Sequence, residues 1–392
     1  MEEWKEYKIS DVIEEISMGP FGSNIKVDNF INSGVPVLNG SNLQGFKLNE
    51  DSFNYVSQEK ADSLGRANAH RGDIVITHRG TLGQIVYIPE DSKFEQYVIS
   101  QSQFRLKLNQ SILRPDFFVY FFHTRLGQHR ILMNASQVGV PALARPTSTF
   151  KEVVVPVPSM NVQDKIMNIL HSLDDKIENN RRINENLEQQ AQALFKSWFV
   201  DFEPFKNGEF VESELGMIPK GWRVGMLGDL LEVKYGKEHK KLADGKIPVY
   251  GSGGLMRSVD KTLYIGESVL IPRKGTLNNV MYVNEGFWTV DTMFYTIPKV
   301  EHIALYCYLF LSGKDLASMN AGSAVPSMTT EILNNMPTVI PQKNIVNNFD
   351  SVVSSYFKKI KNINQESRCL AELRDTLLPK LMSGELKVEN VR

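Results

Sequence analysis

The stretch VQDKIMNILHSLDDKIENNRRINENLEQQAQALFKSWF, residues 162–199, decides the plan of this chain. It contains no proline or glycine, and at ~1.5 Å per residue it predicts a helical rod of roughly 57 Å. A heptad seam runs along it in alternating steps of four and three, the spacing that packs one helix against another: Ile166, Leu170, Leu173, Ile177, Asn180, Asn184, Leu187, Ala191, Leu194 and Trp198. We expect Asn180 and Asn184 to weaken the pairing while setting its register.

A second stretch, residues 344–382, fits the same spacing when 183 is added to each seam position. Eight of the ten resulting residues are apolar: Phe349, Val353, Tyr356, Ile360, Ile363, Ser367, Leu370, Arg374, Leu377 and Leu381. The first rod segment (159–211) carries a net charge of −3 and the second (342–392) a net charge of +3. The two rods are therefore expected to pair with each other, and a homodimeric coiled coil is the alternative.

The rest of the chain repeats as well, which predicts an α+β protein with an internal pseudo-twofold repeat. The segment GVPVLNGSNL (34–43) is answered by KIPVYGSGGL (246–255), and Trp4 is answered by Trp222. We expect two globular modules, residues 1–158 and 206–341, joined by two long antiparallel helices at 159–205 and 342–392. The offset between the copies falls from 218 to 183, so the second module is about 35 residues shorter, and we expect the loss in loops.

Composition and motifs exclude several classes of protein. The formal charge of −1 argues against a surface that is basic throughout, and no apolar run is long enough for a membrane span. Two cysteines and the lack of a basic-plus-apolar leader predict a cytoplasmic setting. No phosphate loop, metalloprotease, serine hydrolase or zinc signature is present. Asp174-Asp175-Lys176 lacks a matching carboxylate nearby, so we expect neither a catalytic centre nor a bound cofactor in this chain.

Polar, glycine-bearing loops remain as candidate contacts to double-stranded DNA. Arginine suits guanine, Asn and Gln suit adenine, and lysine suits phosphate. His78-Arg79-Gly80-Thr81 recurs as Arg273-Lys274-Gly275-Thr276, although a turn that requires the glycine would also explain this recurrence. The first module supplies Asn24, Asn39, Asn42, His78, Arg79, Thr81, Gln137 and Arg145, and the second supplies Lys237, Lys240, Lys241, Arg273, Lys274, Thr276, Asn278 and Asn279.

Three strings show a resemblance to a known family: ALFKSWFVDFEPF (193–205), GMIPKGWRVGMLGDL (216–230) and LRDTLLPKLMSGELKV (373–388). Over essentially its full length the chain resembles the specificity (S) subunits of type I restriction–modification enzymes. The first module departs from the pattern, because it begins at EEWKEYKISDV without an IPKGW string.

The resemblance implies two target recognition domains, each reading one half of a split DNA sequence. It also implies modification subunits, two in number, that dock on the helices and bring S-adenosylmethionine and the adenine-methylating site. Restriction subunits join where the system cuts DNA. The family's recognition loops vary, so no base-reading residue is carried over.

Two alternatives stay open on the residues alone. One is a two-domain DNA-binding regulator, which would normally show a helix-turn-helix and stronger basicity. The other is a scaffold that uses its loops for contacts with proteins.

Overall fold

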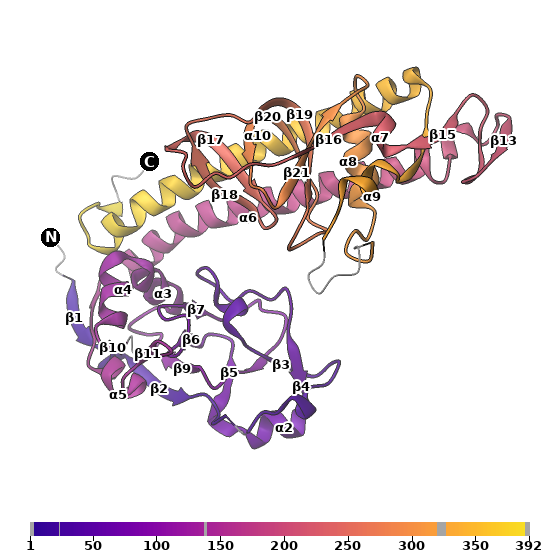
Figure 1. The fold of residues 1–392 in the computed structure, drawn as a ribbon. Coiled ribbons are helices and arrows are strands. Elements are labelled where there is room, and N and C mark those ends of the chain that lie inside the picture. The colour runs from indigo at the N-terminus through magenta and orange to yellow at the C-terminus, as the bar shows by residue number, and fades with distance from the viewer. Residues whose placement is uncertain (1–3, 23, 137–138, 320–326, 389–392) are drawn as a thin grey trace. The chain divides into compact units, whose positions relative to one another are not determined.

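The computed structural model describes residues 4–22, 24–136, 139–319 and 327–388. The chain forms two compact units (Figure 1). Unit 1 combines Met1–Glu178 with Ser367–Arg392, and unit 2 is Asn179–Glu366. Each unit therefore contains part of both long helices together with one globular module.

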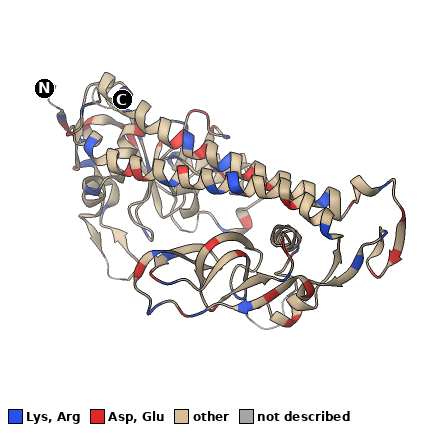
Figure 2. Cartoon of the chain, turned by 90° about the horizontal axis from the view of Figure 1, so that it is seen from above, with Lys and Arg blue, Asp and Glu red and all other residues tan. Residues whose placement is uncertain are grey.

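The two long helices are α6 (Met160–Phe199) and α10 (Lys343–Met382). None of the twenty predicted seam residues is exposed, and Asn180 is almost completely buried. Charged residues of both signs lie along the helices (Figure 2).

The helices pair in an antiparallel manner. In unit 2, Asn180 Nδ2 donates to Glu366 Oε2 at 2.9 Å, and Asn184 Nδ2 donates to Asn364 Oδ1 at 2.8 Å. The partner number falls as the α6 number rises, which gives the antiparallel sense. In unit 1, Arg374 of α10 pairs with Asp174 of α6. The predicted pairing of the two rods is confirmed, and both seam asparagines bond across it.

Unit 1 contains two four-stranded sheets, in the orders β2-β9-β6-β7 and β4-β3-β8-β5. Phe117 and Phe118 of α3 join Leu170 of α6 and Leu381 of α10 in its main core. The elements are β1 (Lys5–Lys8), α1 (Ile9–Val12), β2 (Ile13–Met18), η1 (Val27–Asn29), β3 (Val35–Val37), η2 (Gly40–Leu43), β4 (Asn54–Val56), α2 (Gln58–Ser63), η3 (Gly65–Ala67), β5 (Asn68–His70), β6 (Ile74–Thr77), β7 (Ile85–Tyr87), β8 (Gln96–Val98), β9 (Gln103–Leu108), α3 (Pro115–His123), α4 (Arg125–Leu132), β10 (Ala135–Ser136), β11 (Ala142–Leu143), α5 (Pro146–Lys151) and β12 (Val154–Val157).

Unit 2 contains one six-stranded sheet, in the order β16-β21-β19-β20-β17-β18. Tyr306 of α8 joins Phe195 and Phe199 of α6 and Phe349 of α10 in its main core. The elements are η4 (Glu203–Phe205), β13 (Phe210–Ser213), β14 (Gly216–Pro219), β15 (Arg223–Met226), α7 (Leu227–Leu230), β16 (Leu231–Tyr235), β17 (Asp244–Gly251), β18 (Gly254–Val259), β19 (Tyr264–Pro272), β20 (Met281–Thr289), β21 (Met293–Pro298), α8 (Ala304–Ser312), α9 (Thr330–Asn334) and β22 (Pro337–Ile340).

The strand pairing repeats between the units, as the sequence predicted. The first and last strands pair in both modules, β1 with β12 and β15 with β22. The hairpin β6–β7 corresponds to β19–β20. Each unit also has a matching parallel pair, β3 with β8 and β17 with β20.

The prediction that the second module is shorter only in its loops is wrong in part. Between β3 and β6, unit 1 contains η2, β4, α2, η3 and β5, whereas unit 2 has only β18 between β17 and β19. Regular structure has therefore been lost as well as loop. Ala61 of α2 is buried in a small separate cluster with Val35, Val37 and Val56 of unit 1, so this piece brings its own apolar packing.

Two helices follow one another in unit 1, α3 and α4, and they are divided at Thr124. The Thr124 hydroxyl accepts from Gly127 N at 3.0 Å and caps α4, while the extended backbone of Thr124 ends α3. Gly127 lies so close to Phe121 O that a Cβ there would collide with it. Residues 96–108 likewise form two separate strands, β8 and β9.

The strings that carry the resemblance lie where a long helix ends. After α6, the rings of Phe202 and Phe205 pack edge-on against Trp222, with centroids 5.6 and 5.0 Å away. After α10, Gly384 lies against the Trp4 indole, where an added Cβ would be 3.4 Å from the ring. Each helix end is thus tied to a tryptophan at the start of a module.

Candidate nucleic-acid interface

Five segments of unit 1 form what we call loop surface 1: residues 19–22 with 24, 39–45, 78–84, 100–103 and 139–149. Gly19 N donates to Gln103 O at 2.8 Å, which ties the first segment to the fourth. Gln84 Nε2 donates to Gly40 O at 3.0 Å, which ties the third to the second. Arg79 forms a β-bridge with Ala142 in the fifth. The predicted loops of the first module therefore meet on one surface.

Unit 2 builds loop surface 2 from the matching segments: residues 236–241, 251–255, 273–279, 289–292 and 327–330. Gly236 N donates to Met293 O, next to the fourth segment, at 2.9 Å, and Asn279 Nδ2 donates to Ser252 O at 2.8 Å. Lys274 forms a β-bridge with Ser327, as Arg79 does with Ala142. The same connections thus recur on a different sequence.

The recurring HRGT and RKGT turns have the same backbone. His78 N donates to Ser102 O and Arg273 N donates to Thr292 O, at 2.9 and 2.8 Å. Gly80 and Gly275 have φ of +89° and +85°, a region that disfavours any residue with a Cβ. The turn therefore explains the recurring glycine, while the side chains before it, Arg79 and Lys274, point outward and are exposed.

The charges of these surfaces differ from the charge of the whole chain. Loop surface 1 contains Arg79 and Arg145 and no Asp or Glu, although the chain has 45 acidic residues. Loop surface 2 carries a net charge of +3, because five Lys and Arg outnumber Glu238 and Asp291. Both surfaces are therefore suited to a polyanion, in a protein that is nearly neutral overall.

On loop surface 1, Asn24, Asn39, Thr81 and Arg145 are exposed, like Arg79. Asn39 Oδ1 caps η2 by accepting from Ser41 N at 2.8 Å. Arg145 adopts a left-handed backbone, with φ of 45°, at the start of α5.

Asn42 and His78 lie further inside. Asn42 is 2% exposed, and its Nδ2 donates to Asn49 O and Ser52 O, so it holds the loop from within and does not reach the surface. The half-buried His78 ring bonds to Gln101 O at 3.1 Å, and burial lowers its pKa. Gln137 lies outside the described residues.

On loop surface 2, Lys237, Lys240, Lys241, Lys274 and Thr276 are exposed. The Arg273 guanidinium lies over the Tyr235 ring, 5.4 Å from its centroid.

Both polar atoms of the Asn278 side-chain amide form hydrogen bonds inside unit 2. Its Oδ1 accepts from Ala317 N at 2.9 Å and its Nδ2 donates to Asp315 at 3.0 Å. This hydrogen bond lowers the pKa of Asp315. Asn278 therefore anchors residues 315–317, which sequence reasoning did not foresee.

Sequence reasoning missed two residues of loop surface 1. Phe21 is 84% exposed between Gly19 and Gly22, and Gln101 joins this loop to His78. The glycine on either side of Pro20-Phe21 was the signal available in the sequence, because it marks a backbone held close to a neighbour.

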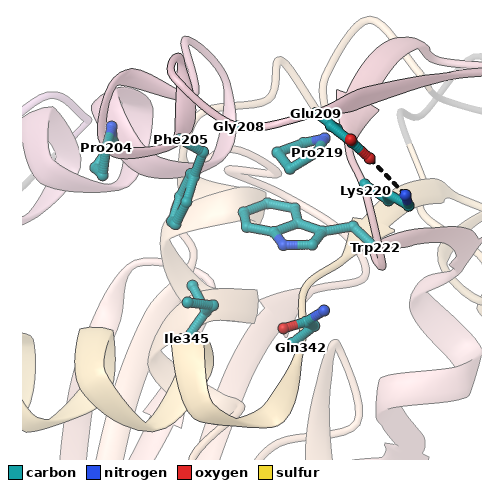
Figure 3. A pocket seen from close by; sticks show the side chains of 9 residues that line it. All are labelled: Pro204, Phe205, Gly208, Glu209, Pro219, Lys220, Trp222, Gln342 and Ile345. Carbon is teal, nitrogen blue, oxygen red and sulfur yellow. Dashed lines mark hydrogen bonds and ion pairs between the residues drawn. The ribbon is translucent and has the colours of Figure 1, made fainter.

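A pocket of about 440 Å³ lies elsewhere in unit 2, around Trp222 (Figure 3). The two charged residues of its wall, Glu209 and Lys220, form an ion pair with each other. Residues 204–222, which follow α6, supply most of the wall: Pro204, Phe205, Gly208, Glu209, Pro219, Lys220 and Trp222. Gln342 and Ile345, at the start of the second helix region, complete it.

Within the described residues, no three His, Cys, Asp or Glu side chains are grouped so that they could hold a metal ion. Among the same residues, no helix has both the length and the apolar character needed to cross a membrane.

Comparisons with known proteins agree with the repeat. A family model described as the type I restriction modification DNA specificity domain matches residues 1–189 and again 219–367. Each match runs from the start of a module into the long helix that follows it.

Relatives match over nearly the whole chain. The type I restriction enzyme MjaIX specificity subunit of Methanocaldococcus jannaschii is 29% identical, over 99% of this chain and 95% of that one. The HindI specificity subunit of Haemophilus influenzae is 26% identical, over 98% and 100%. The crystal structure of a type I S subunit from M. genitalium has the same fold, with a TM-score of 0.58 at 19% identity over 96% of both chains. The chain therefore belongs to the family of type I restriction–modification DNA specificity proteins.

Proposed function

We propose that this chain is the DNA specificity subunit of a type I restriction–modification complex in the cytoplasm. In this proposal loop surface 1 reads one half of a split double-stranded target and loop surface 2 reads the other half. The observation that carries the proposal is the pair of equivalent loop surfaces, one free of acidic residues and one with a net charge of +3. Their backbones match while their side chains differ, as expected of modules that read different half-sequences.

The partners follow from the same repeat. Two modification subunits dock on the long helices, one for each unit, and supply S-adenosylmethionine and the adenine-methylating site. Restriction subunits join where the system cuts DNA. The chain itself supplies the positions and the sequence preference, and it binds no cofactor.

The test compares three preparations: the chain alone, the modification subunit alone, and the two together. Transfer of labelled methyl groups from S-adenosylmethionine to DNA is measured, and methylated sites are mapped by sequencing. We expect transfer only from the combined preparation, at a split sequence.

Methyl transfer or S-adenosylmethionine binding by the isolated chain would contradict the proposal. Sequence-specific DNA binding that never supports methylation with the partner would favour a regulator instead. An exchange of loop surface 1 for that of a relative should change one half-sequence only.

A further inference from the structure

Phe21 is the most exposed large apolar side chain among the described residues, with 84% of its surface in water. It lies in the connection from β2 to η1, on loop surface 1. An aromatic ring left in water gains free energy when a partner covers it.

The loop is held on both sides of Phe21. Gly19 N donates to Gln103 O at 2.8 Å, and a Cβ on Gly19 would collide with Ser100 O. A Cβ on Gly22 would lie 2.6 Å from Gln101 Oε1, and Pro20 is buried. The two glycines thus let the backbone lie close to residues 100–103, and the Phe21 ring between them lies on the solvent side of the loop.

The surroundings indicate what covers the ring. Gln101, against which Gly22 lies, also accepts from the His78 ring, and His78 precedes the exposed Arg79. The five segments of loop surface 1 contain two arginines and no carboxylate. This is a poor surface for a protein partner rich in cations and a suitable one for a nucleic acid, which offers apolar base surfaces among phosphates.

We propose that Phe21 is a base-contacting side chain that packs its ring on the apolar part of a nucleobase in the half-site read by unit 1. Two such surfaces exist, the 5-methyl group of thymine in the major groove and the face of an unstacked base. The inference rests on the proposed function, and it adds a specificity-determining residue to it.

The test uses the full chain assembled with its modification subunits and the DNA target found by methylation mapping. Phe21→Ala is expected to weaken binding by roughly 5- to 100-fold, the range for loss of one base–aromatic contact. The loss should depend on the base at one position of one half-site, and the dependence of binding on salt should stay unchanged. Phe21→Leu should retain part of the effect. Val27→Ala is the matched control, because Val27 is 81% exposed at the start of η1, directly after this connection, but lies outside loop surface 1.

Modified DNA distinguishes the two base surfaces. If Phe21 contacts a thymine methyl group, deoxyuridine at that position weakens the wild type and leaves Phe21→Ala unaffected. If Phe21 instead contacts a base face, an abasic site at that position weakens binding of the wild type and leaves Phe21→Ala unaffected. Deoxyuridine at that position does not give this pattern. Both patterns support the proposal.

Other outcomes overturn it. The proposal is overturned if Phe21→Ala binds and methylates like the wild type at every position. It is also overturned if the variant loses affinity equally for both half-sites, or if its melting temperature is lowered. These outcomes are separable from failure of the proposed function, since in that case the wild-type complex would itself show no split target.

Discussion

Unit 1 and unit 2 carry their charges in different places. In unit 1, Arg374 of α10 pairs with Asp174 of α6 at 2.7 Å, each side chain about 20% exposed, and Tyr120 donates its hydroxyl to the same carboxylate. Arg374 also lies over the Phe46 ring, 5.0 Å from its centroid.

The position in unit 2 that corresponds to Asp174, 183 residues further on, is Phe357. Its ring packs against Tyr282 and Tyr308, with centroids 5.3 and 5.4 Å away. The junction between module and helix is thus polar in one unit and aromatic in the other.

On the loop surfaces the difference in charge is reversed, because unit 2 carries more charged residues there than unit 1. Loop surface 1 has two arginines, whereas loop surface 2 has five Lys and Arg. One backbone plan therefore accepts either kind of junction, and the two loop surfaces differ in charge. If the surfaces bind DNA as proposed, we expect unit 2 to depend more on phosphate attraction and unit 1 more on neutral groups close to the bases.

The largest expected effect comes from breaking the polar junction. Arg374→Met leaves Asp174 partly buried without its cation, and should lower the free energy of unfolding of unit 1 by about 3 kcal/mol. Adding Asp174→Asn should recover most of this loss, because the isolated charge is then gone. Hydrogen exchange of the last turns of α10 measures the change.

Phe357→Leu is the matched change in unit 2, and it should cost about 1 kcal/mol as a reduction in packing. An Arg374→Met variant no less stable than Phe357→Leu would show that the polar junction adds nothing over an apolar one.

The next effect concerns the cationic loop. Replacement of Lys237, Lys240 and Lys241 by Gln removes up to three phosphate contacts, so the slope of log K against log salt should become shallower by roughly 2 to 3. The preferred sequence should not change. Binding titrations at several salt concentrations measure the slope, and Lys246→Gln with Lys261→Gln, two exposed lysines elsewhere in unit 2, provide the control. An unchanged slope would place the DNA away from residues 237–241.

A smaller effect is expected from the matched turns. Arg79→Ala should cost about 1–3 kcal/mol and relax one position of one half-site, because a lost base contact depends on sequence. Lys274→Ala should weaken binding to all sequences and reduce the salt slope by about 1, since it removes a phosphate contact. Selection from a library with both half-sites randomised separates the two. If both variants keep wild-type affinity and specificity, the turns are structural only.

The smallest effect is a pH dependence confined to unit 1. Burial lowers the pKa of His123, whose Nε2 bonds to Ile85 O at 2.9 Å. Between this lowered value and the unfolded value near ~6.5, the unfolded state binds more protons, so the stability of unit 1 should fall as the pH drops below ~6.5. His123→Gln should remove this part of the pH dependence, while unit 2 stays unchanged. Hydrogen exchange at pH 7 and pH 5 tests it, and an equal acid sensitivity in the variant would rule out His123 as the cause.

Several features were determined by the sequence alone. The heptad positions from Ile166 to Trp198 and from Phe349 to Leu381 identified the buried faces of α6 and α10, because periodicity is a local property of a helix. The offset of 195 between Gly80 and Gly275 located two equivalent turns, because a positive φ restricts the residue type wherever it occurs.

Tertiary structure alone decided the rest, because burial depends on segments that are distant in the chain. Asn42 and Asn278 were predicted to face DNA, yet their amides bond to residues 49, 52, 315 and 317 inside their own units. Arg374 occupies a seam position that favours an apolar residue, and its partner Asp174 is 200 residues away. Phe21 is of a residue type usually found in the core, and its exposure became visible only in the tertiary structure, where the loop that carries it packs on residues 100–103.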